Sequence, residues 1–139
     1  MGHWQYAYDV VGNLASQTDA KGQTITFVYD EINRLTFKST GVTYTYDEAG
    51  KDNCKSRLSQ VTDSSGTTEF FYDTLGREKK TIKTPSLRAG ETGEAISYTI
   101  ERTYDSIDRL KTVTYPDGEV ITYTYNTAGG METVSGNES

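Results

Sequence analysis

The sequence has little of several residue types on which common protein classes depend. Its 139 residues include one cysteine and one histidine, and only 34% of them are apolar. The lone Cys54 excludes a disulfide within the chain, and the absence of any run of 18 apolar residues excludes a transmembrane helix. The net charge of −6 does not favour the phosphate backbone of a nucleic acid. The first four residues contain no hydrophobic signal region, so we expect no signal peptide.

Tyrosine, by contrast, is abundant, with 11 copies, and most of them follow a repeated pattern. A Tyr-Asp pair recurs inside similar surroundings, which predicts an array of one repeated unit. The copies are Tyr8-Asp9, Tyr29-Asp30, Tyr46-Asp47, Tyr72-Asp73 and Tyr104-Asp105, with Tyr125-Asn126 as an altered sixth copy.

An alternating segment precedes each pair. Large apolar side chains such as Ile25 and Phe27 fall on the same parity as the motif tyrosine, and threonines such as Thr24 and Thr26 fall between them. Because side chains alternate faces along a strand, this pattern predicts β-strands with an aromatic face and a threonine face. Tyrosine and threonine both favour the pleated surface of a sheet.

Two turns complete each predicted repeat. The motif aspartate is expected to accept hydrogen bonds from the backbone two or three residues on, and the glycine or Asn33 or Asp108 that follows is expected at positive φ. The Arg-Leu pair then begins the outgoing strand. Residues of this kind are Gly12, Gly50, Gly76, Gly129, Arg34-Leu35, Arg57-Leu58, Arg77 and Arg109-Leu110. A second turn is predicted at 20–22, 40–41, 64–66 and 116–118. Two insertions, 51–56 and 87–94, are expected to lengthen turns.

These features predict an all-β chain of about ten to twelve short antiparallel strands in a curved meander. We expect residues 1–139 to form a single array of about six repeats, cut from a longer array. A single sheet leaves its aromatic face without a covering layer unless it curls, folds over or meets another chain. Exposed strand edges therefore predict a homo-oligomer for the isolated fragment.

The pattern Tyr-Asp-x-x-Gly-Arg-Leu, preceded by a strand rich in threonine and tyrosine, resembles the YD-repeat or RHS-repeat family over roughly residues 4–134. The resemblance implies a β-sheet ribbon that spirals into a hollow shell, as in bacterial RHS polymorphic toxins, the cocoon of insecticidal toxin complexes and the barrel of teneurins. In the bacterial members the shell encloses a C-terminal toxin. The shell-closing core, its self-cleavage motif and a toxin domain are absent from this chain.

No catalytic constellation stands out. His3 is the only histidine, and Cys54, which we expect to be a surface thiol, lies among cationic residues that could lower its pKa but has no second histidine as a base. The motif aspartates recur at every turn, whereas a catalytic pair needs two unlike environments, so we expect turn capping. Asp105 with Asp108, or Asp117 with Glu119, could hold calcium, but the ligand count is too low. We therefore expect no enzyme, no cofactor and no metal.

The resemblance implies a structural shell segment that, in the parent protein, encapsulates a toxin or other C-terminal cargo. Its expected partners are the neighbouring repeats, without nucleic acid or membrane insertion. The resemblance implies that the parent is bacterial, delivered by a secretion system, and secreted or associated with the cell envelope. The alternative is a carbohydrate- or cell-surface-binding module in which Tyr44 and Tyr123 stack on sugar rings.

Overall fold

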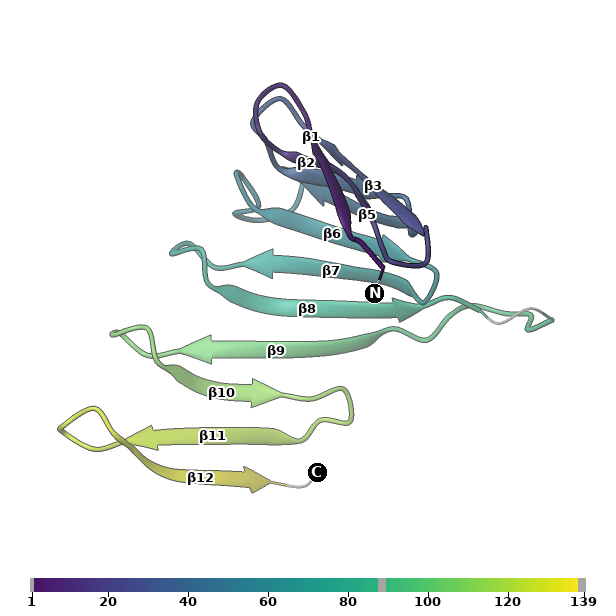
Figure 1. Ribbon diagram of the computed structural model, residues 1–139. Helices are drawn as coiled ribbons and strands as arrows, with labels where there is room; N and C mark the ends of the chain where they lie inside the picture. The colour runs from purple at the N-terminus through teal and green to yellow at the C-terminus, as the bar shows by residue number, and fades with distance from the viewer. Residues whose placement is uncertain (1, 88–89, 138–139) are drawn as a thin grey trace.

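The computed structural model describes residues 2–87 and 90–137, and in these residues it contains strands and turns but no helix. Twelve strands form one sheet, and each strand pairs antiparallel with its neighbours in the sequence (Figure 1). The all-β meander predicted from the alternation is confirmed. The strands are β1 (Gln5–Tyr8), β2 (Leu14–Thr18), β3 (Thr24–Tyr29), β4 (Leu35–Lys38), β5 (Val42–Tyr46), β6 (Leu58–Asp63), β7 (Gly66–Tyr72), β8 (Glu78–Pro85), β9 (Tyr98–Tyr104), β10 (Leu110–Thr114), β11 (Val120–Tyr125) and β12 (Met131–Asn137).

The pairing register gives the sheet two chemically different faces. On β5, Tyr44 and Tyr46 lie opposite Val61 and Leu58 of β6. The intervening threonines of β5 lie opposite Thr62 and Gln60, on the other side of the sheet. Since opposite residues share a face, we call these the tyrosine face and the threonine face.

The same bulge recurs at every motif tyrosine. Each tyrosine pairs with the first residue of the outgoing strand, and the next residue of that strand is left without an opposite partner. Because a bulge bends its strand and increases the local twist, its repetition curves the whole ribbon. The pairs beside the bulges are Tyr8 with Leu14, Tyr29 with Leu35, Tyr46 with Leu58, Tyr72 with Glu78, Tyr104 with Leu110 and Tyr125 with Met131.

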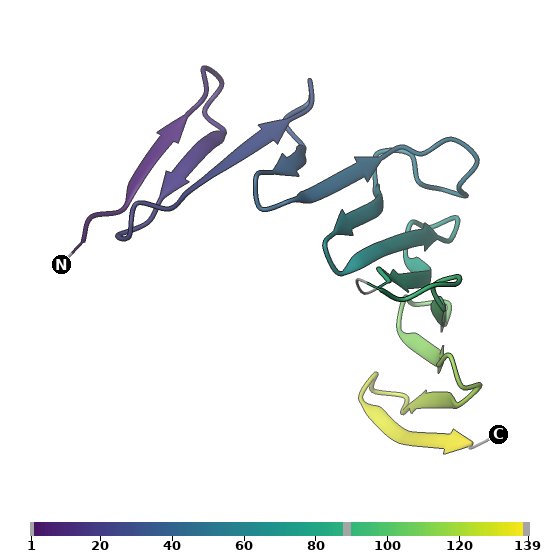
Figure 2. The same ribbon diagram turned by 90° about the vertical axis from the view of Figure 1, so that its right-hand side faces the viewer.

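The sheet is a single layer that bends near β5–β7 (Figure 2). Within the described residues, only Cys54, Ser59 and Val113 are buried. No second layer covers either face there, so the described part of the chain has no conventional hydrophobic core. The insertion at 51–56 lies in the loop between β5 and β6, at the bend. The second insertion lies between β8 and β9, and its residues 88–89 are outside the described part of the chain.

Two sets of turns form the long edges of the ribbon. The motif edge contains the turns 9–13, 30–34, 47–57, 73–77, 105–109 and 126–130, each of which follows a motif tyrosine. The opposite edge contains the connections 19–23, 39–41, 64–65, 86–97 and 115–119. From β7 onward the two edges lie on the left and right of Figure 1. Chemistry that recurs in every repeat is concentrated at the motif edge.

Candidate functional site: the ladder along the motif edge

The turn at Asp73 shows the local geometry of the motif edge. One carboxylate oxygen, Oδ1, accepts hydrogen bonds from the backbone N–H groups of Leu75 and Arg77, both at 2.9 Å. The other oxygen, Oδ2, accepts from Nε of Arg77 at 2.6 Å. One side chain therefore closes the turn and fixes the direction of the arginine. Equivalent bonds form at Asp30 with Ile32 and Arg34, and at Asp105 with Ile107 and Arg109.

Hydrogen bonding lowers the pKa of these carboxyl groups. For Asp30 the largest cause is the backbone N–H of Arg34. For Asp73 and Asp105 desolvation would raise the pKa, but the backbone and side-chain bonds from Arg77 and Arg109 outweigh it. These aspartates are therefore ionised, and their carboxylate oxygens are already engaged in hydrogen bonds. Such carboxylates serve a structural role and are not suited to proton transfer.

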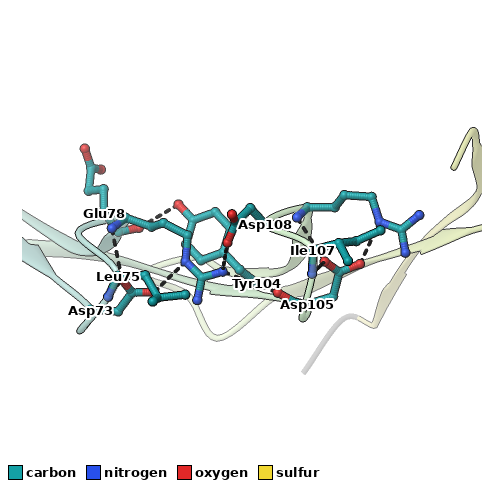
Figure 3. A network of polar contacts seen from close by, with 9 residues as sticks. Asp73, Leu75, Glu78, Tyr104, Asp105, Ile107 and Asp108 are labelled. Atoms are coloured by element: carbon teal, nitrogen blue, oxygen red, sulfur yellow. Dashed lines mark hydrogen bonds and ion pairs between the residues drawn. The ribbon is translucent and has the colours of Figure 1, made fainter.

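Each arginine also reaches the next repeat. Nη1 of Arg77 donates to Oδ1 of Asp108 at 2.6 Å and to the backbone carbonyl of Asp105 at 3.3 Å (Figure 3). The guanidinium lies over the ring of Tyr104, with 4.7 Å between its carbon and the ring centroid. The planar guanidinium group of Arg77 therefore joins two turns and covers one tyrosine ring. The ammonium group of a lysine cannot reproduce this geometry. Similar cation–π contacts join Arg34 to Tyr46, Arg57 to Tyr72 and Arg109 to Tyr125.

The motif tyrosine makes the return contact. The hydroxyl of Tyr104 donates to the backbone carbonyl of Glu78, the first residue of β8, at 2.8 Å. This carbonyl belongs to the preceding repeat, so each repeat is bonded to the one before it. The same bond joins Tyr29 to Leu14, Tyr46 to Leu35, Tyr72 to Leu58 and Tyr125 to Leu110, at 2.7–3.1 Å. Together the aspartate, arginine and tyrosine contacts form a continuous ladder along the motif edge.

The first repeat keeps the ladder with an amide in place of the arginine. Nδ2 of Asn13 donates to Oδ2 of Asp9 at 3.0 Å and to Oδ1 of Asn33 at 2.8 Å. A neutral side chain therefore fills the same bridging position between two turns.

The insertion replaces one part of the ladder with backbone contacts. Asp47 differs from the expected Asx turn, because its Oδ1 accepts from the backbone N–H of Ser56, nine residues on. Its Oδ2 pairs with Nη2 of Arg34 at 2.6 Å. Arg57 does not pair with Asp47, the motif aspartate of its own repeat, and instead donates to the carbonyls of Asn53 and Lys55 at 3.0 and 3.3 Å. The loop therefore orients Arg57 over the next tyrosine although the usual spacing is lost.

The expectation that Cys54 is a surface thiol is wrong. Its side chain is 1% exposed, and Sγ lies 3.6 Å from the carbonyl of Phe70. Burial raises the pKa of this thiol and outweighs the cationic neighbours Lys51 and Arg57, so the lowering that these cations could have produced does not occur. The loop folds back on the sheet and encloses the thiol, and a buried, protonated thiol is a poor nucleophile.

Lys51, in the same loop, is a second residue whose role was not recognised in the sequence. Its Nζ lies 2.8 Å from carboxylate oxygens of Glu48 and Glu69, and its side chain is 9% exposed. Burial would lower the pKa of Lys51, but the hydrogen bonds that its ammonium group donates to both glutamates outweigh burial and raise the pKa. The loop is thus attached to β7 by a paired charge.

The other sequence-derived site residues are placed as follows. Gly12, Gly50 and Gly76 have positive φ, as do Asn33 and Asp108. Leu35 and Leu110 begin β4 and β10, and their carbonyls accept the tyrosine hydroxyls. Tyr8 is 64% exposed. Tyr44 and Tyr123 are half-buried, and Nζ of Lys38 lies 5.5 Å from the centroid of the Tyr44 ring.

The inter-repeat role of the arginines was not inferred from the sequence. A signal for it exists, because each arginine stands four residues after its aspartate in three copies: Asp30 and Arg34, Asp73 and Arg77, and Asp105 and Arg109. A constant acid–base spacing within a turn indicates a required pair. The contacts to the next repeat depend on strand register, which the spacing does not reveal.

Within residues 2–87 and 90–137, no group of three or more histidine, cysteine, aspartate or glutamate side chains could hold a metal ion. The described residues also include no helix long and apolar enough to cross a membrane.

Comparison with known proteins agrees with this geometry. The RHS Repeat family model matches residues 8–42 and 104–136. The crystal structure of TcdB2-TccC3 matches 98% of this chain and 8% of its own, with a TM-score of 0.83 and 17% sequence identity. The structure of TcdB2-TccC3 without its hypervariable C-terminal region also matches with a TM-score of 0.83 and 17% sequence identity, over 99% of this chain and 8% of that one. The Tc holotoxin pore of Photorhabdus luminescens matches with a TM-score of 0.62 and 17% sequence identity, over 97% of this chain and 9% of that one. No curated protein sequence matches this chain.

The fold and the ladder define a β-repeat protein, in which successive hairpins are joined by the same side-chain contacts. The chain contains RHS repeats at residues 8–42 and 104–136. It spans less than a tenth of the length of the solved chains that it resembles, and at this identity those likenesses establish the fold alone.

Proposed function

We propose that this chain is a wall segment of an RHS-repeat shell, a structural and non-enzymatic part of a longer protein that encloses a toxin or other C-terminal cargo. The observation that carries the proposal is the hydrogen bond from each motif tyrosine after Tyr8 to a carbonyl of the preceding repeat. Because this bond recurs, it joins successive hairpins without requiring a hydrophobic core.

The physical properties of the sheet suit a wall. It is one layer thick, and the bulge at each motif tyrosine curves it. The side-chain ladder stabilises the contact between repeats where the described residues supply almost no buried apolar surface. A catalytic site, in contrast, needs groups of unlike environment, and the motif aspartates all make the same turn contacts.

The proposal treats residues 1–139 as one array of about six repeats within a longer ribbon. Its partners are the neighbouring repeats of the same protein. Since one matched structure is named as a Tc holotoxin pore of Photorhabdus luminescens, we place the parent protein among secreted or envelope-associated bacterial toxins delivered by a secretion system.

The test is protection of the cargo from protease in the longer protein that contains this chain. Arg77→Ala removes the pair with Asp73, the bond to Asp108 and the contact with Tyr104, so it should open the wall and speed cleavage of the cargo. Lys111→Ala, at an exposed position on β10, is the matched control and should leave protection unchanged. Equal cleavage of the cargo with and without the repeats would contradict encapsulation.

The carbohydrate-binding alternative is not favoured. Sugar stacking needs a freely accessible ring face, whereas Tyr44 and Tyr123 are half-buried and an ammonium group lies over the Tyr44 ring. Titration against a glycan panel distinguishes the alternatives. Saturable binding that Tyr44→Ala or Tyr123→Ala abolishes would support a binding module and count against a purely structural role.

A further inference from the structure

A row of exposed aliphatic side chains runs along the motif edge. Each occupies the same position, two residues after the motif aspartate, and each is 64–67% exposed. Aspartate bonds the backbone N–H of these residues and so fixes their direction, while no described side chain covers them. Leu75 and Ile107 are labelled in Figure 3 beside the ladder. The row consists of Val11, Ile32, Leu75 and Ile107.

The opposite edge has a hollow of about 520 Å³ between the connections that flank β9 and β10. Its apolar lining includes Ile96, Tyr98, Tyr115 and Pro116, and the first of these is 74% exposed. Glu119 lies at the same hollow. A protruding aliphatic residue on one edge and an apolar hollow on the other are complementary features of one chain.

Charge distinguishes the turn at Ile107 from the other turns of the row. Arg34 and Arg77 each pair with a second carboxylate, on Asp47 and Asp108. Arg109 pairs in the described residues with Asp105 alone, which leaves its Nη atoms without a carboxylate partner. The turn that presents Ile107 therefore also carries an incompletely paired cation, and the hollow carries the anionic Glu119.

We propose that the turn at Ile107 docks into the Ile96–Tyr115 hollow of a second copy of this chain, with Arg109 facing Glu119 across the contact. The inference deepens the proposed wall function and rests on it, because a ribbon that curls into a wall must meet another stretch of repeats edge to edge. The two surfaces differ, so the contact is heterologous and generates an open series of ribbons side by side.

Sedimentation of the chain over a concentration series tests the docking. The wild type is expected to form assemblies that grow beyond dimers as concentration rises. Ile107→Glu and Ile96→Glu each bury a charge at the contact and should each weaken association by roughly tenfold or more. Because both positions are exposed turn residues, the two variants should retain the wild-type circular dichroism. Ser106→Glu, at the exposed neighbour of Ile107, is the matched control and should assemble like the wild type.

Mixing the two variants gives the sharpest readout. Each defective chain retains one working surface, so an equimolar mixture should form dimers and stop there. Association as strong in either variant as in the wild type would overturn the docking and point to pairing of strand edges instead. A wild-type monomer at every concentration up to about 1 mM would overturn it too. Either failure leaves the wall proposal to its own test, cargo protection in the longer protein.

Discussion

At the scale of single residues, the repeated motif is explained by one shared bonding pattern. Aspartate closes the turn, arginine joins that turn to the next repeat, and tyrosine returns a hydrogen bond to the preceding one. The Asp73, Arg77 and Tyr104 contacts show why these residue types occur together. Aspartate has two acceptor oxygens for backbone and arginine, and arginine has a planar fork for two carboxylates.

Tyr104→Phe should lower the free energy of unfolding by about 1 kcal/mol, because it removes the hydroxyl that bonds the Glu78 carbonyl and keeps the ring under Arg77. Urea denaturation measures the change. Tyr44→Phe is the control, because its hydroxyl makes no hydrogen bond within the described residues, and it should be close to neutral. Equal effects of the two substitutions would remove the ladder bond as an explanation.

Asp73→Ala should cost on the order of 1 kcal/mol, because it removes the acceptor of two backbone N–H groups and of the Arg77 side chain. The wall proposal assigns no catalytic activity to be lost. Chemical denaturation of the variant, beside Asp117→Ala in the opposite-edge turn, measures whether the motif position is the more sensitive one.

Acid should destabilise the fold through the same carboxylates. The pKa values of Asp30, Asp73 and Asp105 are lowered in the folded chain, so the folded state binds fewer protons than the unfolded state in acid. Their stabilising contribution is complete above the unfolded pKa of about 4 and is lost as pH falls through the folded values. Urea midpoints between pH 7 and pH 2 measure the loss, which should be smaller in Asp73→Asn. A flat profile would show that the ion pairs contribute little.

At the scale of elements, the hairpin is repeated with one constant feature and one variable feature. The bulge at the motif tyrosine is constant, and it sets the register of the strands on either side. Turn length is variable, as the loop 47–57 shows. That loop replaces the missing acid–base spacing with carbonyl contacts to Arg57 and attaches itself to β7 through Lys51.

A comparison of Gly76→Ala with Gly12→Ala tests whether the carbonyl contacts of Arg57 contribute to stability. Both glycines have positive φ, so the backbone strain is similar in the two variants. A Cβ on Gly76 would meet the Arg57 guanidinium, whereas a Cβ on Gly12 meets nothing within 4 Å. We expect Gly76→Ala to destabilise by about 1 kcal/mol more, since Arg57 must leave its carbonyl contacts. Thermal or urea unfolding measures the difference in free energy of unfolding between the two variants. In an Arg57→Ala background the extra cost of Gly76→Ala should disappear.

At the scale of the whole molecule, the sheet is a bent single layer whose few buried residues include two near the bend. Cys54 and Ser59 lie there, and the Ser59 hydroxyl donates to the Thr45 carbonyl at 3.0 Å. The residues of β1 and β12 are all exposed. Stability should therefore vary along the ribbon.

Native-state hydrogen exchange is expected to be slowest in β6–β8 and fastest in β1 and β12. The reason is that the central strands carry the loop contacts and neighbours on both sides, while the outermost described strands each pair on one side. Mass spectrometry of peptides from each hairpin measures the order. Uniform protection along the chain would mean that the ribbon opens as one cooperative unit.

The strand positions were predictable because alternation of tyrosine and threonine is a local signal. Turn chemistry was predictable at Asp73 for the same reason, since the aspartate bonds the next few residues. The ladder partners of Arg77 and Tyr104 were not predictable, because these partners lie 26 to 31 residues away in the sequence and depend on strand register. The burial of Cys54 was missed because a polar insertion gives no sign that it folds back on the sheet.

The sequence by itself determined the β-strand repeat, the two faces and the closing of the motif turns, since each of these depends on residues a few positions apart. Tertiary structure alone decided the ladder between repeats, the bend, the enclosure of Cys54 and the row and hollow on opposite edges. These features depend on which strand lies beside which and on the bulge that offsets them. Such distances are set only when the sheet is assembled.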